Sequence, residues 1–460
     1  MRSPDAAAVH RAPFRPLLMK ELREVLGGRA LWTMLLLLCP LVGYSFFQAV
    51  ALYGEASAAA RDSPTLASGL SPLDGVLVPT FGALYVSVTL LFPFVAIRTL
   101  GREKETGALR LLIQLPYRVA TLVAAKMTAI SAAWLISAIP AVSALAIWVI
   151  LGGHLHAPET FDLLLGQLLY GLLVGAIALF AAAVSESSAT AAIVTLAFTI
   201  GSWVLDFSLA GQPGLLQWLS LLSLTQTLRS FEQGLLSVGL VVGIVAAIGG
   251  FSALAALWLH PGTPPRTRLV RSIGCMAIVA AVLALATQIR SSIDLTEDRR
   301  NSFPAADQRA LAELREPLTI TVHLAPEDPR YVDLRRNVLS KLERVMPHVT
   351  VRLATAGQSM VGSTGDESYG EIEYLYGGRS ARTRSTSHRE ALPMLYDLAG
   401  RPVPAPVPGE EYPGYPLVAG AELALPWFLG ALPLLIAGAW WWTRRAPRIP
   451  RSPIEQGGQP

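Results

Sequence analysis

The most charged patch in the first half of this apolar sequence is one short run, which has the residue types of a surface that packs against protein. Residues 98–118 read RTLGREKETGALRLLIQLPYR. A charged turn is followed by Gly107 and then by leucines at positions 109, 111 and 112. This spacing predicts a short helix that packs against a protein surface. A solvated basic loop explains the charges but leaves the apolar stripe unexplained.

Motifs that would carry catalysis are missing from the sequence. A phosphate-binding loop ends in Gly-Lys-Ser/Thr, and none of the four lysines follows a glycine. The sequence also lacks HExxH, CxxC and Gly-x-Ser-x-Gly. His154 and His156 are two residues apart in a loop, which is a weak signal for a metal site. We therefore predict a chain that is not an enzyme and holds neither metal nor cofactor.

The composition indicates a membrane protein. Of 460 residues, 52% are hydrophobic and only 15% are charged, whereas soluble domains carry about a quarter charged residues. The net charge is +4, but the basic residues lie beside apolar runs, where the positive-inside rule places them. We therefore expect no nucleic-acid partner. Cys39 and Cys275 fall within apolar runs and are expected to act as small hydrophobic residues.

Eight apolar runs approach the length of about 20 residues that a helix needs to cross a bilayer. We predict an all-α bundle of about eight membrane-spanning helices. The runs cover approximately residues 30–51, 80–97, 120–151, 163–184, 189–207, 235–259, 272–289 and 423–442. An amphipathic helix over residues 15–29, with its charges on the face opposite the apolar stripe, is expected to lie along the membrane. Whether residues 208–234 re-enter the membrane is left open.

Few ionisable residues fall inside the spans. Lys126, Glu186 and Asp206 lie near span edges. We expect their side chains to be interfacial or to snorkel toward water.

Residues 290–416 have the composition of a soluble segment and predict a small α/β domain. Residues 318–324, 349–353 and 371–376 read as strands, and residues 332–345 have helical spacing. The Arg-rich segments fall on one side of the membrane when the number of spans is even. The topology therefore predicts two cytoplasmic termini and a periplasmic α/β domain.

The run after the second span resembles the first cytoplasmic loop of ABC-2 type transporter permeases. That loop carries an acidic-basic-acidic triplet, then Gly-Thr-Leu, two leucines and Ser/Thr-Pro, with a lysine farther along. The matching positions are Glu103, Lys104, Glu105, Gly107, Leu109, Leu111, Leu112, Pro116 and Lys126. Ala108 and Leu115 depart from the pattern. The resemblance implies that this segment, beginning at Arg102, docks on a nucleotide-binding subunit.

The N-terminal helix resembles the entry helix of the same family through Lys20, Glu21 and Arg23. The resemblance divides the chain into consecutive segments. These are a cytoplasmic tail and entry helix (1–29), a six-helix permease domain (30–259), a cytoplasmic linker (260–271), a seventh transmembrane helix (272–289), the periplasmic domain (290–416), an eighth helix (423–443) and a cytoplasmic tail (444–460).

A second resemblance covers the start of the soluble segment. Residues 293–303 read IDLTEDRRNSF, and a Pro-Leu-Thr-Ile-Thr strand follows at residues 317–321. This pattern is similar to the periplasmic domain of the gliding-motility auxiliary ABC transporter family. Phe303 stands where leucine is usual, and the domain is shorter than that of the family.

Together the resemblances imply the permease subunit of an ABC-2 type exporter in the bacterial inner membrane. ATP and magnesium would bind to a separate ATPase subunit, and a second permease copy or a paralogue would complete the transporter within the membrane lipid. Charge reversal at Glu103 and Glu105 would then abolish transport. The alternative is a membrane-anchored scaffold that presents a periplasmic protein-binding domain. The substrate is left open.

Overall fold

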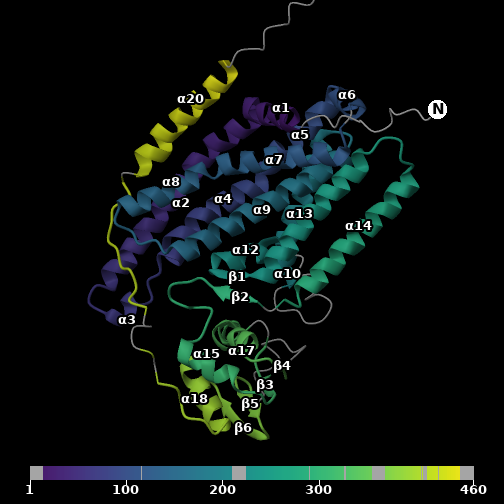
Figure 1. The fold of residues 1–460 in the computed structure, drawn as a ribbon. Helices are drawn as coiled ribbons and strands as arrows, with labels where there is room; N and C mark the ends of the chain where they lie inside the picture. Colours follow the sequence, from purple (N-terminus) through teal and green to yellow (C-terminus); the bar gives the residue numbers. More distant parts are fainter. Residues whose placement is uncertain are drawn as a thin grey trace, which may run out of the picture.

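The computed structural model describes residues 14–115, 117–209, 224–289, 291–325, 328–354, 368–405, 407, 412–422 and 424–445. A helical bundle carries a small α/β domain at one of its ends (Figure 1). The bundle and the domain have separate hydrophobic cores. This architecture confirms the predicted class, a membrane helical bundle with a small sheet-containing part.

Seven helical stretches in the described part of the chain are long and apolar enough to cross a membrane. They are α2 (Arg29–Ala59), η1 with α4 and α5 (Leu73–Leu77, Val78–Leu90 and Phe92–Glu105), α7 with α8 (Val119–Ser137 and Ile139–Ile150), α9 (Ala157–Val184), α13 (Val238–Leu259), α14 (Pro265–Ala286), and α19 with η3 and α20 (Ala424–Pro426, Trp427–Ala431 and Leu432–Arg445). Each overlaps a predicted run. The remaining predicted run coincides with α10 (Ser188–Leu209), whose described apolar stretch is shorter.

The second and third spans are each divided into consecutive helices near a proline. Pro93 lies in the first turn of α5, and Pro140 lies in the first turn of α8. Proline lacks an N–H group and clashes with the preceding turn, so it interrupts a long helix. The second span is also longer than predicted at both ends, because the π-helical turn η1 precedes α4 and the charged turn continues α5 as far as Glu105.

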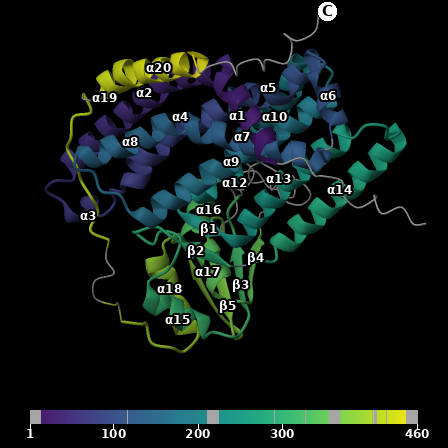
Figure 2. The same ribbon diagram turned by 45° about the horizontal axis from the view of Figure 1, so that its top comes forward.

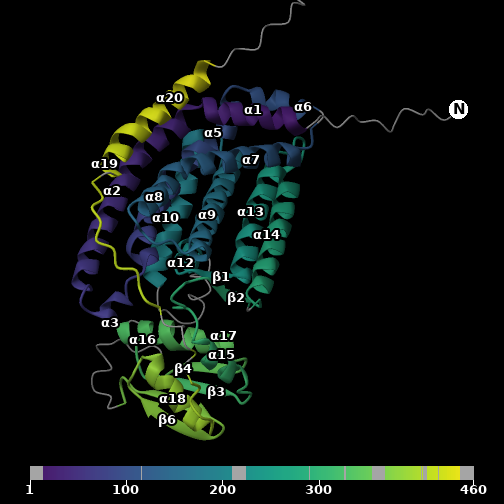
Figure 3. The ribbon, with the colours of Figure 1, turned by 60° about the vertical axis from the view of Figure 1, so that its left-hand side comes forward.

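The central helix of the bundle is α9, against which α5, α7, α10 and α13 pack. At one edge, α14 lies beside α13 and is otherwise mostly exposed (Figure 3). At another edge, α20 packs along α2. Phe428 of η3 sits directly against Gly43 of α2, where a Cβ would overlap the phenyl ring. Glycine at position 43 therefore permits this close approach.

Four shorter helices complete the described part of the bundle. They are α1 (Phe14–Gly27), α3 (Pro64–Ala67), α6 (Ala108–Gln114) and α12 (Leu224–Glu232). Both α1 and α6 lie at the end of the bundle away from the α/β domain (Figure 3). We call this the α6 end, and the opposite end the domain end. Residues 210–223, part of the segment for which re-entry was left open, lie outside the described residues.

The α/β domain contains a four-stranded sheet in the order β4-β3-β5-β6. Its strands are β3 (Leu318–Val322), β4 (Val349–Leu353), β5 (Ile372–Tyr376) and β6 (Arg379–Thr383). The pair β3–β4 is parallel, and the other pairs are antiparallel. Alternate residues of β3 and β5 are buried, as the period of two in a strand requires. The three predicted strands are confirmed, and the Arg-rich strand β6 was not predicted.

Helices of the domain share a hydrophobic core with the sheet. They are α15 (Ala305–Ala312), α16 (Pro329–Leu334), η2 (Arg335–Leu339), α17 (Ser340–Val345) and α18 (His388–Leu398). A two-stranded antiparallel sheet joins β1 (Leu235–Ser237), before α13, to β2 (Ser292–Asp294), after α14. The chain then returns from α18 along the side of the bundle to α19 (Figure 2).

Candidate functional site

A network of charged side chains joins α1, α5 and α7 at the α6 end of the bundle. Lys126 of α7 is fully buried, and its Nζ lies 3.0 Å from Oε2 of Glu21 on α1. The same Nζ lies 2.7 Å from Oε2 of Glu103 on α5 and donates to the carbonyl of Thr99 at 2.6 Å. Lys20 donates to Oε1 of Glu21 at 3.0 Å and to Oε1 of Glu103. Each carboxylate therefore bridges two ammonium groups.

The network neutralises charges that burial would otherwise make costly. Glu21 and Glu103 are almost fully buried, and buried charges are tolerated when they are paired. Burial raises the pKa of Glu21, although Lys126 beside it favours the charged form. Burial disfavours the charged form of Lys20, but its hydrogen bonds to Glu103 and Glu21 and the negative charges of both carboxylates together outweigh this effect and raise the pKa of Lys20. Glu24 pairs with Lys20 at 3.1 Å from the next turn of α1.

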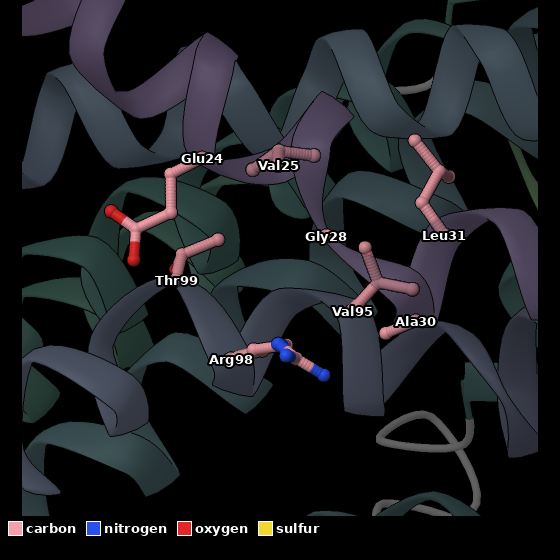
Figure 4. A pocket seen from close by; sticks show the side chains of 8 residues that line it. All are labelled: Glu24, Val25, Gly28, Ala30, Leu31, Val95, Arg98 and Thr99. Atoms are coloured by element: carbon pink, nitrogen blue, oxygen red, sulfur yellow. The ribbon is translucent and has the colours of Figure 1, made fainter. Parts of the chain in front are cut away.

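The arrangement of the acidic groups suits an internal ion network better than a ligand site. Carboxylate oxygens of Glu21, Glu24 and Glu103 lie within 4.8 Å of one another, but Lys20 and Lys126 supply positive charge at the same place. The neighbouring cavity, with Glu24 and Arg98 on its walls, has a volume of about 10 Å³ (Figure 4). That volume is about the space of one water molecule.

Lys104 and Glu105 fix the end of α5 to the turn between α9 and α10. Lys104 Nζ donates to the carbonyls of Ala183 at 2.7 Å and Ser185 at 3.0 Å, at the C-terminal end of α9. Ser188, the first residue of α10, donates through its hydroxyl to Oε1 of Glu105 at 2.5 Å. A cation at a helix C-terminus and an anion at an N-terminus are both favoured by the helix dipole. The charged triplet 103–105 thus contacts four other helices of its own chain.

A turn at Gly107 separates the charged triplet 103–105 from α6. Gly107 has a φ of +75°, which favours glycine, and α6 begins at the next residue. On α6, Leu109 is buried, Leu112 is half-buried and Leu111 is 68% exposed. Pro116 lies outside the described residues. The helix therefore packs one leucine inward and presents another outward.

The segment predicted to dock on a nucleotide-binding subunit thus has two sides. Arg23, Arg102 and Leu111 are exposed at the α6 end. The side chains that contact the rest of the chain are those of Lys20, Glu21, Glu103, Lys104, Glu105 and Leu109.

Two sequence-based expectations about this region are wrong. Lys126 does not snorkel, because its ammonium group points inward to Glu21 and Glu103. Glu21 does not belong to an exposed charged face of α1, because it lies on the buried face with Leu17 and Val25. A lone lysine inside an apolar span was the available signal, since charged groups in membrane helices usually face a partner within the bundle.

The two histidines between α8 and α9 differ in their hydrogen bonding within the described part of the chain. His154 Nε2 lies 2.7 Å from Oε2 of Glu297. His156 Nδ1 is buried and makes no hydrogen bond to the described residues. The side chain of Asp206 lies outside the described residues.

Comparison with known families matches residues 15–285 to the ABC-2 family transporter proteins. The match runs from α1 into α14, so it includes the ion network and α6, and it ends before the α/β domain. Neither the curated proteins nor the solved structures give a significant match. Because the match covers more than half of the chain, this protein belongs to the ABC-2 transporter family and is a multi-pass membrane component of an ABC transporter.

Proposed function

We propose that the chain is the permease subunit of an ABC-2 type exporter in the bacterial inner membrane. A separate ATPase subunit would hydrolyse ATP, with its magnesium, and would drive movement of a substrate through this subunit. The observation that carries the proposal is the two-sided segment at the α6 end. It presents Leu111 and Arg102 outward and joins α1, α7, α9 and α10 through its charged triplet.

The contacts suggest how force on α6 would reach the spans. The exposed side chain of Leu111 would offer an apolar contact to the ATPase, and Arg23 and Arg102 are exposed at the same end of the bundle. Displacement of α6 would move the end of α5. Glu103 would transmit that movement to α1 and α7, and Lys104 to the end of α9. Coupling of this kind requires that the ATPase bind one arrangement of these helices more tightly than another.

The distribution of basic residues supports an orientation with the α6 end in the cytoplasm. Arg98, Arg102, Arg110 and Arg118 lie at that end of the bundle, where the positive-inside rule requires them. Both termini would then be cytoplasmic, and the α/β domain would be periplasmic. By its resemblance to the gliding-motility auxiliary family, that domain would bind a partner or guide substrate. A second copy or a paralogue would complete the transporter.

The scaffold alternative has one observation in its favour, which is that the α/β domain has a hydrophobic core of its own. Purification of the full-length chain from native membranes separates the two functions. A permease is expected to bring down a P-loop ATPase in a fixed ratio, and Leu111→Asp is expected to lower the recovered ATPase at least tenfold. Leu66→Asp is the matched control, because Leu66 is 58% exposed on α3 at the domain end. Wild-type protein without an ATPase would favour the scaffold.

A further inference from the structure

The start of the segment after α14 is an ordered turn organised by one carboxylate. Asp294 accepts hydrogen bonds from the backbone N–H of Thr296 at 3.2 Å and from its hydroxyl at 2.6 Å. It also accepts from the backbone N–H of Asn301 at 3.0 Å and from the hydroxyl of Ser302 at 2.7 Å. These four bonds fold residues 294–302 into a compact turn. We call this turn the clamp.

One side chain of the clamp, Arg300, reaches the connection between α2 and α4. Its guanidinium pairs with Asp74 of η1 and donates to the hydroxyl of Ser71 at 2.8 Å. Asp298 of the clamp holds the same guanidinium at 2.9 Å. Only 12% of the Arg300 side chain is exposed. Charge-assisted bonds made by a shielded guanidinium are among the stronger contacts of a protein.

Glu297 of the clamp reaches the connection between α8 and α9. Its Oε2 lies 2.7 Å from His154 Nε2, and its backbone N–H donates to Oε2 of Glu159 at 3.4 Å. Tyr415, on the returning chain, donates to Oε1 of Glu297 and stacks on His154 with ring centroids 3.6 Å apart. The hydrogen bond to Glu297 raises the pKa of Tyr415 to about 12.

The clamp also holds the connection between α12 and α13. Asn301 donates through its side-chain amide to the carbonyl of Gln233 at 2.6 Å. The backbone N–H of Leu295 donates to the carbonyl of Gly234 at 2.9 Å. The clamp therefore contacts every described connection between bundle helices at the domain end. The connection through residues 210–223 lies outside the described residues.

We propose that the clamp ties the domain end of the bundle closed, with Arg300 and Glu297 as its positioning residues. The helix ends that it joins belong to separate spans, so they separate only when these contacts break or when the domain moves with one of them. The α/β domain would thus regulate opening of the bundle at its own end. This proposal rests on the proposed function only for the claim that nucleotide drives the opening.

Hydrogen exchange of the full-length chain in lipid nanodiscs tests the clamp. Arg300→Met is expected to raise the exchange of η1 and of the first turns of α9 at least tenfold, which corresponds to about 1.4 kcal/mol. Exchange in β3 and β5 should stay at the wild-type level, because these strands lie in a separate core. Arg309→Met is the matched control, since among the described residues the hydrogen bond of the Arg309 side chain stays within α15, to the carbonyl of Ala305.

A second variant acts from the bundle side, so that unfolding of the domain cannot mimic the effect. Asp74→Asn removes the charge partner that Arg300 has on the bundle, leaves its partner Asp298 in the clamp, and does not change the domain. It should raise exchange in the same segments. If Arg300→Met also raises hydrogen exchange in β3, the exchange measured in Asp74→Asn decides whether the clamp holds η1 and α9. Exchange within twofold of wild type at η1 and α9 in Asp74→Asn would overturn the clamp.

The nucleotide arm uses the chain with its copurified ATPase, supplied with ATP and vanadate. Wild-type η1 and α9 should then exchange as fast as in Arg300→Met without nucleotide. If the variants raise exchange as expected but nucleotide does not change the exchange of η1 and α9 in the wild type, nucleotide-driven opening is overturned and the proposal of the clamp is retained. Failure of any ATPase to copurify counts against the proposed function alone.

Discussion

Replacement of Lys126 by methionine should release α1 from the bundle. The change removes two ion pairs and a hydrogen bond to the carbonyl of Thr99. Among the described residues, Lys20 is then the one cation paired with the buried Glu21 and Glu103. Removing one partner of a buried pair costs about 3–5 kcal/mol, because the remaining charge stays desolvated. At 1.4 kcal/mol per factor of ten, a loss of about 3 kcal/mol corresponds to roughly a hundredfold increase in opening.

Hydrogen exchange of the α1 amides in the purified full-length chain measures this opening directly. Lys104→Met is the matched control, because the hydrogen bonds of the Lys104 ammonium group within the described part of the chain go to the end of α9 and not to α1. The combined variant Glu21→Gln, Glu103→Gln, Lys126→Met should recover much of the protection, since an uncharged replacement of a whole buried network is often neutral. Exchange of α1 within tenfold of wild type in Lys126→Met would refute the reasoning. An equal increase in Lys104→Met would refute it as well.

Two further predictions concern the packing of α20 on α2 and the stability of the α/β domain. Gly43→Val should destabilise the packing of η3 and α20 on α2 by about 1–3 kcal/mol through overpacking, which would be measured as faster hydrogen exchange in α20. Phe428→Ala in the same chain should restore part of the lost stability. An unchanged exchange rate in Gly43→Val would contradict the close contact. Burial lowers the pKa of Lys341 from 10.5 to about 8, so between these values the unfolded chain binds more protons than the folded domain, and stability should rise with pH. Thermal unfolding of the domain within the full chain should show this rise, and Lys341→Met should flatten it; a wild-type profile that falls from pH 8 to 10.5 would contradict the assignment.

Much of the fold was predictable because its signals are local. A helix that crosses a bilayer must be apolar over about 20 residues, so each predicted run overlaps a helix of the bundle. The strands β3, β4 and β5 were predicted from the alternation of β-forming residues. The strand β6 was missed because its sequence, RSART, carries no such alternation of apolar and polar residues.

The site was predictable only in part. The family resemblance located the segment that contains Glu103, Lys104 and Glu105, but it implied one common role, docking on another subunit. The structure assigns these neighbours to different helices of the same chain, with Glu103 on Lys20 and Lys126, Lys104 on α9, and Glu105 on α10. Consecutive residues of a helix point in directions about 100° apart, so each meets a different neighbour, and the neighbours are set by packing.

By itself, the sequence determined that the chain crosses a membrane several times, that a small α/β domain follows the bundle, and that one charged run has the pattern of a coupling segment. Only the tertiary structure decided that Lys126 turns inward to Glu21, which lies 105 residues away in the chain, and that Arg300 reaches Asp74, which lies 226 residues away. The physical reason is that lipid tails are as apolar as a protein interior. Hydropathy therefore identifies a membrane helix but does not distinguish its inward face from its lipid face, and charge partners become visible only once the helices are packed.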